Sequence, residues 1–239
     1  MINYRKLVVL GIATLSYLMI SGCEHHCCPP AENIERTLEI RQPLTKTGEV
    51  DGDAYLNSHV TLENINGRFD IHNIVAKWTR FGEPVSYRTY LKLDLSEIKD
   101  NEEIESAILI LHTKPNGSDN KVPDNVCKDS IPNYIQVCLV EDSWDLEDLT
   151  WVHQPRISPL PDEYLYFNIP SDFPPIMRLD LTALVKKIAG KDKKDENNGF
   201  LFRMYTEGDS EFYQSFVFYS INAAREKQPY LKVRLVPNN

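Results

Sequence analysis

Charged side chains occupy even positions in the segment 87–95, where Arg88, Lys92 and Asp94 alternate with apolar residues. This period of two is typical of a strand with one buried face, so the three charges share the other face. Such a row can bind the carboxylate of a ligand, and Arg does so with bidentate geometry. The alternative, which we expect more often, is a solvated or internally paired face. Arg88 and Lys92 are therefore candidate ligand-binding residues.

The three tryptophans are the next candidates. Trp144 and Trp151 could form a stacking platform for a sugar ring, but large aromatic side chains usually lie in the core, and we expect both to cap it. Trp78 lies close to Arg80 and outside the other motifs. We therefore predict that Trp78 is an exposed aromatic residue and that Arg80 assists it in ligand binding.

An acidic segment follows the strong apolar run at 134–140. Glu141, Asp142 and Asp145 supply hard oxygen atoms suited to Ca²⁺, and a structural calcium ion is the one cofactor that we consider. The segment lacks the glycine and the ligand order of an EF-hand loop. The alternative is a solvated acidic loop.

Two of the five cysteines could form a disulfide. Cys127 and Cys138 lie eleven positions apart on either side of a turn rich in Pro and Asn. Nearer the N-terminus, the run His25–Cys28 could bind a soft metal, although a flexible tether is the better interpretation because such crowded ligands cannot easily surround one ion.

No catalytic motif is present, which favours a protein that is not an enzyme. The chain has no HExxH, G-x-S-x-G or P-loop sequence, although paired carboxylates could still exist by chance. The net charge is −9, and nonspecific nucleic-acid binding needs a basic surface. We therefore expect no nucleic-acid partner.

The pattern of the chain predicts an all-β fold, a two-sheet antiparallel β-sandwich with one short helix. Segments 87–95 and 107–111 are expected to pair as an antiparallel ribbon, and further strands are expected at 134–140, 176–181, 200–205, 215–221 and 230–236. The helix should start near Asp180 or Thr182 and end at Gly190, because residues 184–189 carry one apolar stripe. A tight turn is expected at Asn198-Gly199.

The first 22 residues have the pattern of a targeting segment. Arg5 and Lys6 precede an apolar run at 7–20, and Ile20-Ser21-Gly22-Cys23 resembles the lipobox of bacterial lipoproteins. This predicts a signal peptide at 1–22, lipidation of Cys23, a tether at 23–48 and one domain at 49–239. The location would be the bacterial cell envelope, at the outer membrane or cell surface, with membrane contact through the lipid alone.

From about residue 53 to 236, the chain resembles the DNRLRE-domain family of secreted modules. The matching pieces are 53–55, 88–96, 104–109, Trp144 with 149–151 and Pro155, 179–182 with Val185, 198–200, and Pro229 with Leu231. The resemblance implies a jelly-roll sandwich and, for members placed among carbohydrate-binding modules, binding of polysaccharides, acidic ones included.

These observations lead to a ranked set of hypotheses. The first is a lipid-anchored, non-catalytic carbohydrate-binding module, which requires exposed aromatic groups or a cleft with converging polar groups. The alternative is a structural or adhesive surface protein with a protein partner, which requires an apolar patch or an open sheet edge. A polysaccharide-active enzyme ranks third.

Overall fold

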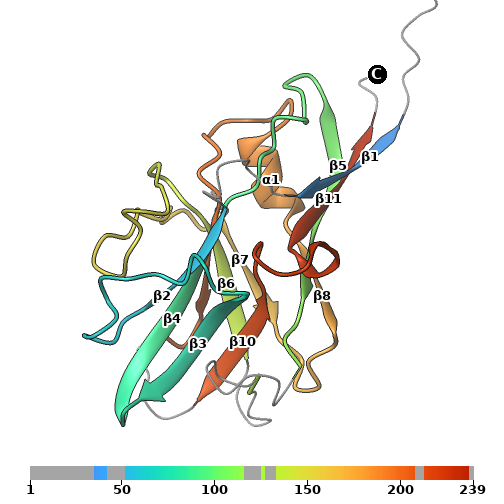
Figure 1. Ribbon diagram of the computed structural model, residues 1–239. Coiled ribbons are helices and arrows are strands. Elements are labelled where there is room, and N and C mark those ends of the chain that lie inside the picture. Colours follow the sequence, from blue (N-terminus) through green and yellow to red (C-terminus); the bar gives the residue numbers. More distant parts are fainter. Residues whose placement is uncertain (1–34, 42–51, 116–124, 127–132, 208–212, 237–239) are drawn as a thin grey trace, which may run out of the picture. The chain divides into compact units, whose positions relative to one another are not determined.

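Two antiparallel β-sheets pack face to face, and one short helix lies at their edge (Figure 1). The computed structural model describes residues 35–41, 52–115, 125–126, 133–207 and 213–236. The expected all-β sandwich with a single short α-helix is confirmed over this part of the chain.

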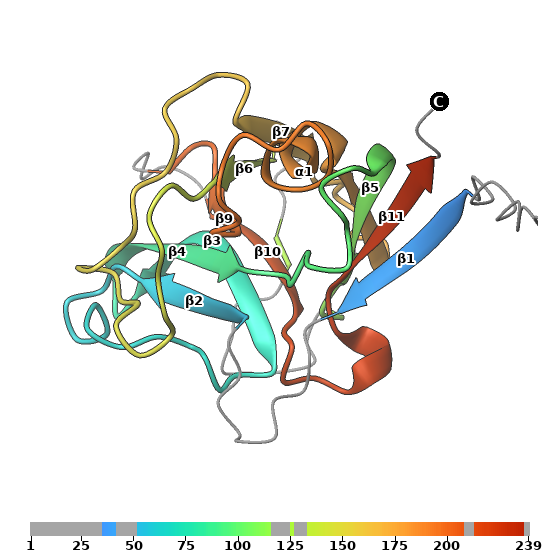
Figure 2. The ribbon, with the colours of Figure 1, turned by 90° about the horizontal axis from the view of Figure 1, so that it is seen from above.

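The smaller sheet has four strands in the order β1 (Arg36–Arg41), β11 (Tyr230–Val236), β5 (Glu103–His112) and β8 (Ile176–Asp180). The larger sheet has seven strands. Its main path is β10 (Gln214–Tyr219), β3 (His72–Arg80), β4 (Glu83–Leu91), β9 (Phe200–Met204), β6 (Tyr134–Leu139) and β7 (Tyr164–Asn168), and β2 (Asp53–Asn57) pairs with β4. Figure 2 shows β1, β11 and β5 on one side of the sandwich and β2 with β4 on the other.

The main core lies between the sheets, because alternate residues of the strands point inward. Leu109 and Val233 of the smaller sheet belong to the same buried cluster as Val137, Phe202 and Phe218 of the larger sheet, and none of the five is exposed to solvent. Burying whole apolar side chains of this size supplies the main stabilising free energy, about 1.5–3 kcal/mol for each residue.

The helix α1 spans Thr182–Ile188, where the sequence predicts it, and a 3₁₀ turn, η1, spans Arg225–Lys227. Oδ1 of Asp180 accepts hydrogen bonds from the backbone N–H (3.0 Å) and the hydroxyl (2.6 Å) of Thr182. Gly190 has φ +73°, a left-handed conformation that suits glycine at the end of a helix.

Two sequence-based expectations need correction. The segments 87–95 and 107–111 do not form a ribbon: β4 belongs to the larger sheet and β5 to the smaller one, so the chain between them crosses from sheet to sheet. The predicted tether at 23–48 contains β1, which pairs with β11 and buries Ile40 in the core. The folded part therefore includes residues before 49. Residues 1–34, with the predicted signal peptide and Cys23, lie outside the described residues.

Candidate functional site

The outer face of the larger sheet carries a compact group of polar and aromatic side chains from β6, β7 and β9, with Tyr205 one residue beyond the end of β9. We call Tyr134, Gln136, Tyr166, Arg203 and Tyr205 the tyrosine face. The register places Gln136 directly opposite Tyr166 of β7 on one side and Arg203 of β9 on the other. The Tyr205 N–H donates to the Tyr134 carbonyl at 2.9 Å, which continues the same pairing one step further.

Strand alternation turns these side chains outward. Ile135 and Val137 of β6 and Phe202 and Met204 of β9 are buried in the core between the sheets. Their neighbours along each strand must therefore project from the opposite face. Tyr134, Tyr166 and Tyr205 are 38%, 47% and 60% exposed, far more than a core aromatic residue.

Direct contacts hold the group in place. The Nε of Arg203 donates to Oε1 of Gln136 (2.7 Å), and Nε2 of Gln136 donates to the Tyr166 hydroxyl (3.1 Å). The rings of Tyr166 and Tyr205 meet edge to face with centroids 5.2 Å apart, and Tyr164 packs against Tyr166 in the same way at 5.4 Å. The face is thus ordered before any ligand arrives, which reduces the entropic cost of binding.

Desolvation raises the pKa of two tyrosine hydroxyls on the outer side of the larger sheet. Desolvation, followed by the neighbouring hydroxyls of Tyr164 and Tyr205, raises the pKa of Tyr166. Desolvation also raises the pKa of Tyr90, although the nearby guanidinium groups of Arg88 and Arg203 oppose that rise. The Tyr166 hydroxyl is therefore neutral at neutral pH.

A loop covers the neighbouring part of this outer face. Trp144 and Trp151 are partly buried and pack on a second apolar cluster that includes Tyr90, Cys138 and Leu201. The indole N–H of Trp144 donates to the Asn198 carbonyl at 2.7 Å. The two tryptophans therefore cover buried side chains, as the sequence predicts. The tyrosine face lies beside this cluster, and Tyr164 contacts both.

The predicted candidate Arg88 lies beside this loop, but its guanidinium is already paired. It forms a bidentate ion pair with Glu207 (2.7 and 2.9 Å), donates to Gln154 Oε1 (2.8 Å) and lies 4.6 Å from the centre of the Trp151 ring. The internally paired alternative is therefore the correct one for Arg88. Its role is to hold the loop against β4.

The other three predicted ligand-binding residues do not join Arg88 in one site. Trp78 is partly buried against Tyr213, with ring centroids 5.0 Å apart, so the prediction of a freely exposed indole is wrong. Arg80 lies over the Phe81 ring at the turn between β3 and β4. Lys92 lies just beyond the opposite end of β4, where its N–H donates to the Gly52 carbonyl.

The predicted calcium ligands are occupied by protein partners. Asp142 forms a bidentate ion pair with Arg156 (2.8 and 3.0 Å), and Glu141 lies 3.8 Å from the same guanidinium. Asp145 Oδ1 accepts the N–H groups of the two residues at 147 and 148. Within the described ranges, no three His, Cys, Asp or Glu side chains gather in a way that would hold a metal ion.

Only one cysteine of the predicted Cys127–Cys138 disulfide lies among the described residues. Cys138 is a free, buried thiol that lies between Leu201 and Tyr164 in the sheet, and desolvation raises its pKa to about 11. Cys127 lies outside the described residues. The outward side of β6 at this point is covered by the 141–163 loop, which leaves Cys138 in an apolar setting.

Sequence reasoning missed the tyrosine face. In each of the segments 134–136, 164–166 and 203–205, a period of two places the first and third residues on the same face of a strand. This alternation was the signal available in the sequence. The strand β7 was not predicted at all. The order of β9, β6 and β7 in the sheet, which brings the three pairs together, depends on long-range pairing.

No family model matches the chain, and no curated protein matches it. The family resemblance inferred from the sequence remains a prediction. Among the residues described, no helix is long and apolar enough to cross a membrane.

Proposed function

We propose that the chain is a non-catalytic carbohydrate-binding module that holds a polysaccharide on its tyrosine face. The observation that carries the proposal is the exposed group of Tyr134, Tyr166 and Tyr205 around a fixed Arg203 and Gln136. Tyrosine rings offer a flat apolar surface for the C–H face of a pyranose, with a hydroxyl at the rim for hydrogen bonds. The lipid anchor predicted at Cys23 would keep this module, and its glycan, at the cell envelope.

The polar groups of the face suit a hydroxylated ligand. The amide oxygen of Gln136 accepts a hydrogen bond from Arg203, and its amide nitrogen donates one to Tyr166. The role of Gln136 is therefore to orient both neighbours. Arg203 uses its Nε for this contact, and the remaining guanidinium N–H groups can donate to hydroxyl or carboxylate oxygens.

A second candidate function is adhesion to a protein partner. Large apolar side chains are exposed in the loop before β3 and in the turn between β3 and β4: Val60 (72%), Phe69 (73%) and Phe81 (84%). Arg68 and Arg80 lie over the two phenylalanine rings. Exposed aromatic and arginine residues are enriched in protein interfaces, which favours this alternative for the loop region.

A glycan array separates the two functions. The full chain would be purified in a detergent without a sugar headgroup, so that the detergent cannot compete, and applied with calcium and again with a chelator. The proposal predicts selective binding to polysaccharides under both conditions. Silence across neutral and acidic glycans from a folded protein would contradict the proposal and favour a protein partner. Binding that requires calcium would assign a metal to the site.

A further inference from the structure

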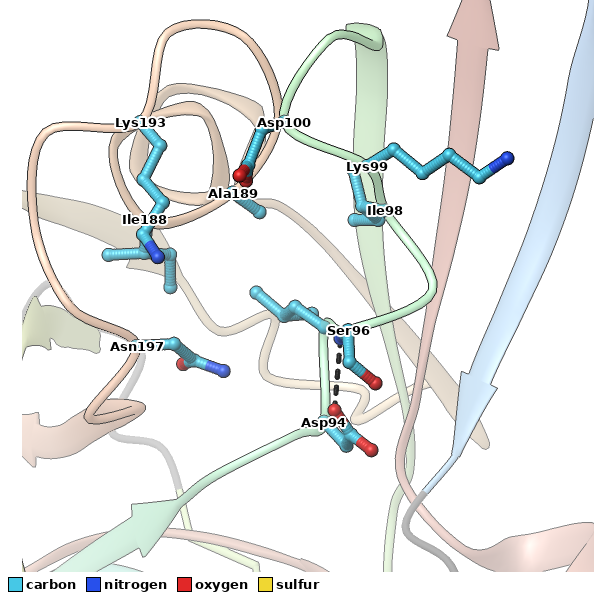
Figure 3. A pocket seen from close by; sticks show the side chains of 10 residues that line it. Asp94, Ser96, Ile98, Lys99, Asp100, Ile188, Ala189, Lys193 and Asn197 are labelled. Carbon is cyan, nitrogen blue, oxygen red and sulfur yellow. Dashed lines mark hydrogen bonds between the residues drawn. The ribbon is translucent and has the colours of Figure 1, made fainter.

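A pocket of about 510 Å³ lies away from the tyrosine face, between the segment that follows β4 and the end of α1. Asp94, Ser96 and Asp100 line it from the first segment, and Lys193 and Asn197 line it from the loop after the helix (Figure 3). This volume is within the range of small-molecule sites in proteins.

The pocket is preformed by contacts that fix both of its walls. Asn197 Nδ2 donates to the Leu93 carbonyl (2.8 Å), and Asn197 Oδ1 accepts the Gly199 N–H (3.2 Å). On the opposite wall, Glu102 receives a bidentate ion pair from Arg36 of β1 (2.7 and 2.8 Å), and its carbonyl accepts the Lys191 N–H at 2.9 Å.

The base of the pocket is apolar. Ile98, Ile188 and Ala189 are each at most 5% exposed and contribute to the lining. Ile188 and Ala189 lie there because they end the apolar stripe of α1, which faces the core. A ligand in this pocket therefore needs an apolar face of its own.

Two carboxylates and two lysines line the pocket, but only one of the lysines turns toward its middle. Asp94 and Asp100 are two carboxylates, and Lys193 is the cation whose amine turns toward the middle, whereas the Lys99 side chain extends away (Figure 3). The nearest ion-pair partner of Lys193 is Glu196, at 4.0 Å. Asp100 has no hydrogen bond or ion pair with any residue of the described ranges. In a chain of net charge −9, this excess of carboxylates favours a cationic ligand over an anionic one.

We infer that this pocket binds an amino sugar, a pyranose whose ammonium group pairs with Asp100. Its hydroxyl groups would donate to Asp94 and accept from Lys193, and its C–H face would pack on Ile188 and Ala189. The inference rests on the proposed function, because it names the kind of sugar that a second site would select. The pocket and the tyrosine face share no residue, so each is tested separately.

Methyl NMR of the full chain in the same detergent tests this inference. The δ1 methyl groups of Ile98 and Ile188 report from inside the pocket, and the probes are glucosamine, glucose and glycine. Glucosamine should shift both methyl signals and bind on the order of tenfold more tightly than glucose, because a charge-assisted hydrogen bond is stronger than a neutral one. Asp100→Asn should remove this preference. The matched control Glu97→Gln removes the same charge from the same loop, outside the lining, and should retain it.

Four results would overturn the inference: no methyl shift with glucosamine, equal affinity for glucose, a preference for the amine that survives Asp100→Asn, or equal binding of glycine. The last result would assign the pocket to small ammonium compounds in general. None of these results depends on the tyrosine face. If the pocket binds no amino sugar but the chain still binds polysaccharide, the proposed function stands. If the pocket binds the amino sugar but the chain binds no polysaccharide, the proposed function is wrong.

Discussion

At the scale of single residues, Asp53 is the most unusual side chain of the described structure. It is 1% exposed at the start of β2, and its Oδ2 accepts hydrogen bonds from Asn73 Nδ2 (2.6 Å) and the Ile221 N–H (3.0 Å). Desolvation outweighs these bonds and raises the pKa of the carboxyl from 3.8 to about 7. Asp53 therefore links β2 to β3 and to the segment that follows β10, at the cost of a buried ionisable group.

This pKa predicts how stability depends on pH. Because the folded pKa lies above the unfolded one, the protonated carboxyl contributes its full stability below about pH 3.8, and that contribution is lost as the pH rises toward about 7. The free energy of unfolding should fall by about 1.4 kcal/mol per pH unit across this window from this group alone. Urea unfolding at a series of pH values measures it.

The variant Asp53→Asn should flatten this dependence, because its amide oxygen can still accept both hydrogen bonds and cannot ionise. The exposed Asp172→Asn variant is the control and should keep the wild-type profile. An Asp53→Asn profile as steep as that of the wild type would show that another group titrates in this window.

At the scale of elements, the turn into β9 depends on one glycine. Gly199 has φ +78°, and a Cβ there would lie 2.5 Å from the Leu91 carbonyl oxygen and 2.9 Å from Lys92 Cα. Both are backbone atoms of the segment that leaves β4, so they cannot move without disturbing the sheet. Gly199 therefore allows β9 to enter the sheet beside β4.

Two glycine variants separate close approach from backbone strain. Gly82 also has a positive φ, +89°, but a Cβ there would meet nothing within 4 Å. Gly82→Ala should cost about 1–2 kcal/mol of unfolding free energy from strain alone. Gly199→Ala should lower the unfolding free energy by at least about 2 kcal/mol more, because the backbone at Leu91 and Lys92 must also move away from the added Cβ. Chemical denaturation of both variants checks this, and equal losses would contradict the close approach.

How far the sequence predicts these elements depends on the range of the interactions involved. Period-two alternation at 87–95 locates the second half of β4, although the strand itself spans Glu83–Leu91. The apolar run locates β6, and the stripe at 184–189 with Gly190 locates α1, because these signals are local. The pairing of β5 with β11 and β8, instead of with β4, depends on contacts between distant segments. Strand β1 escaped prediction because its inward side chains, Leu38 and Ile40, are too few to show a clear period.

The same difference in range explains the candidate site. Arg88 was identified from its strand, but the sequence could not show that Glu207, 119 positions away, neutralises it. The tyrosines lie on three strands that only the sheet order brings together. The exposed tyrosines could therefore not be identified from the sequence. The tryptophans that the sequence singled out are packed against other side chains in the structure.

At the scale of the whole molecule, the buried core and the proposed ligand-binding surfaces lie in different parts of the sandwich. One face of the larger sheet builds the core with the smaller sheet. The other face carries the cluster under the covering loop with its tryptophans, a further apolar cluster on β3, β4 and β10, and the exposed tyrosine face. The amino-sugar pocket lies where the chain crosses between the sheets, in the segment between β4 and β5. Two separate ligand contacts would let an anchored module hold a polymer at two points, which raises its effective affinity.

The affinity of the full chain for the glycan that the array selects, measured by calorimetry for four proteins, tests the central claim most directly. The Tyr166→Ala, Tyr205→Ala double variant should bind about tenfold more weakly or worse than wild type, because two aromatic contacts are lost. The matched Tyr166→Phe, Tyr205→Phe variant should keep most of the affinity, and Phe81→Ala, which removes an exposed aromatic ring elsewhere, should bind as wild type does. A folded double alanine variant with wild-type affinity would contradict the assignment of the tyrosine face.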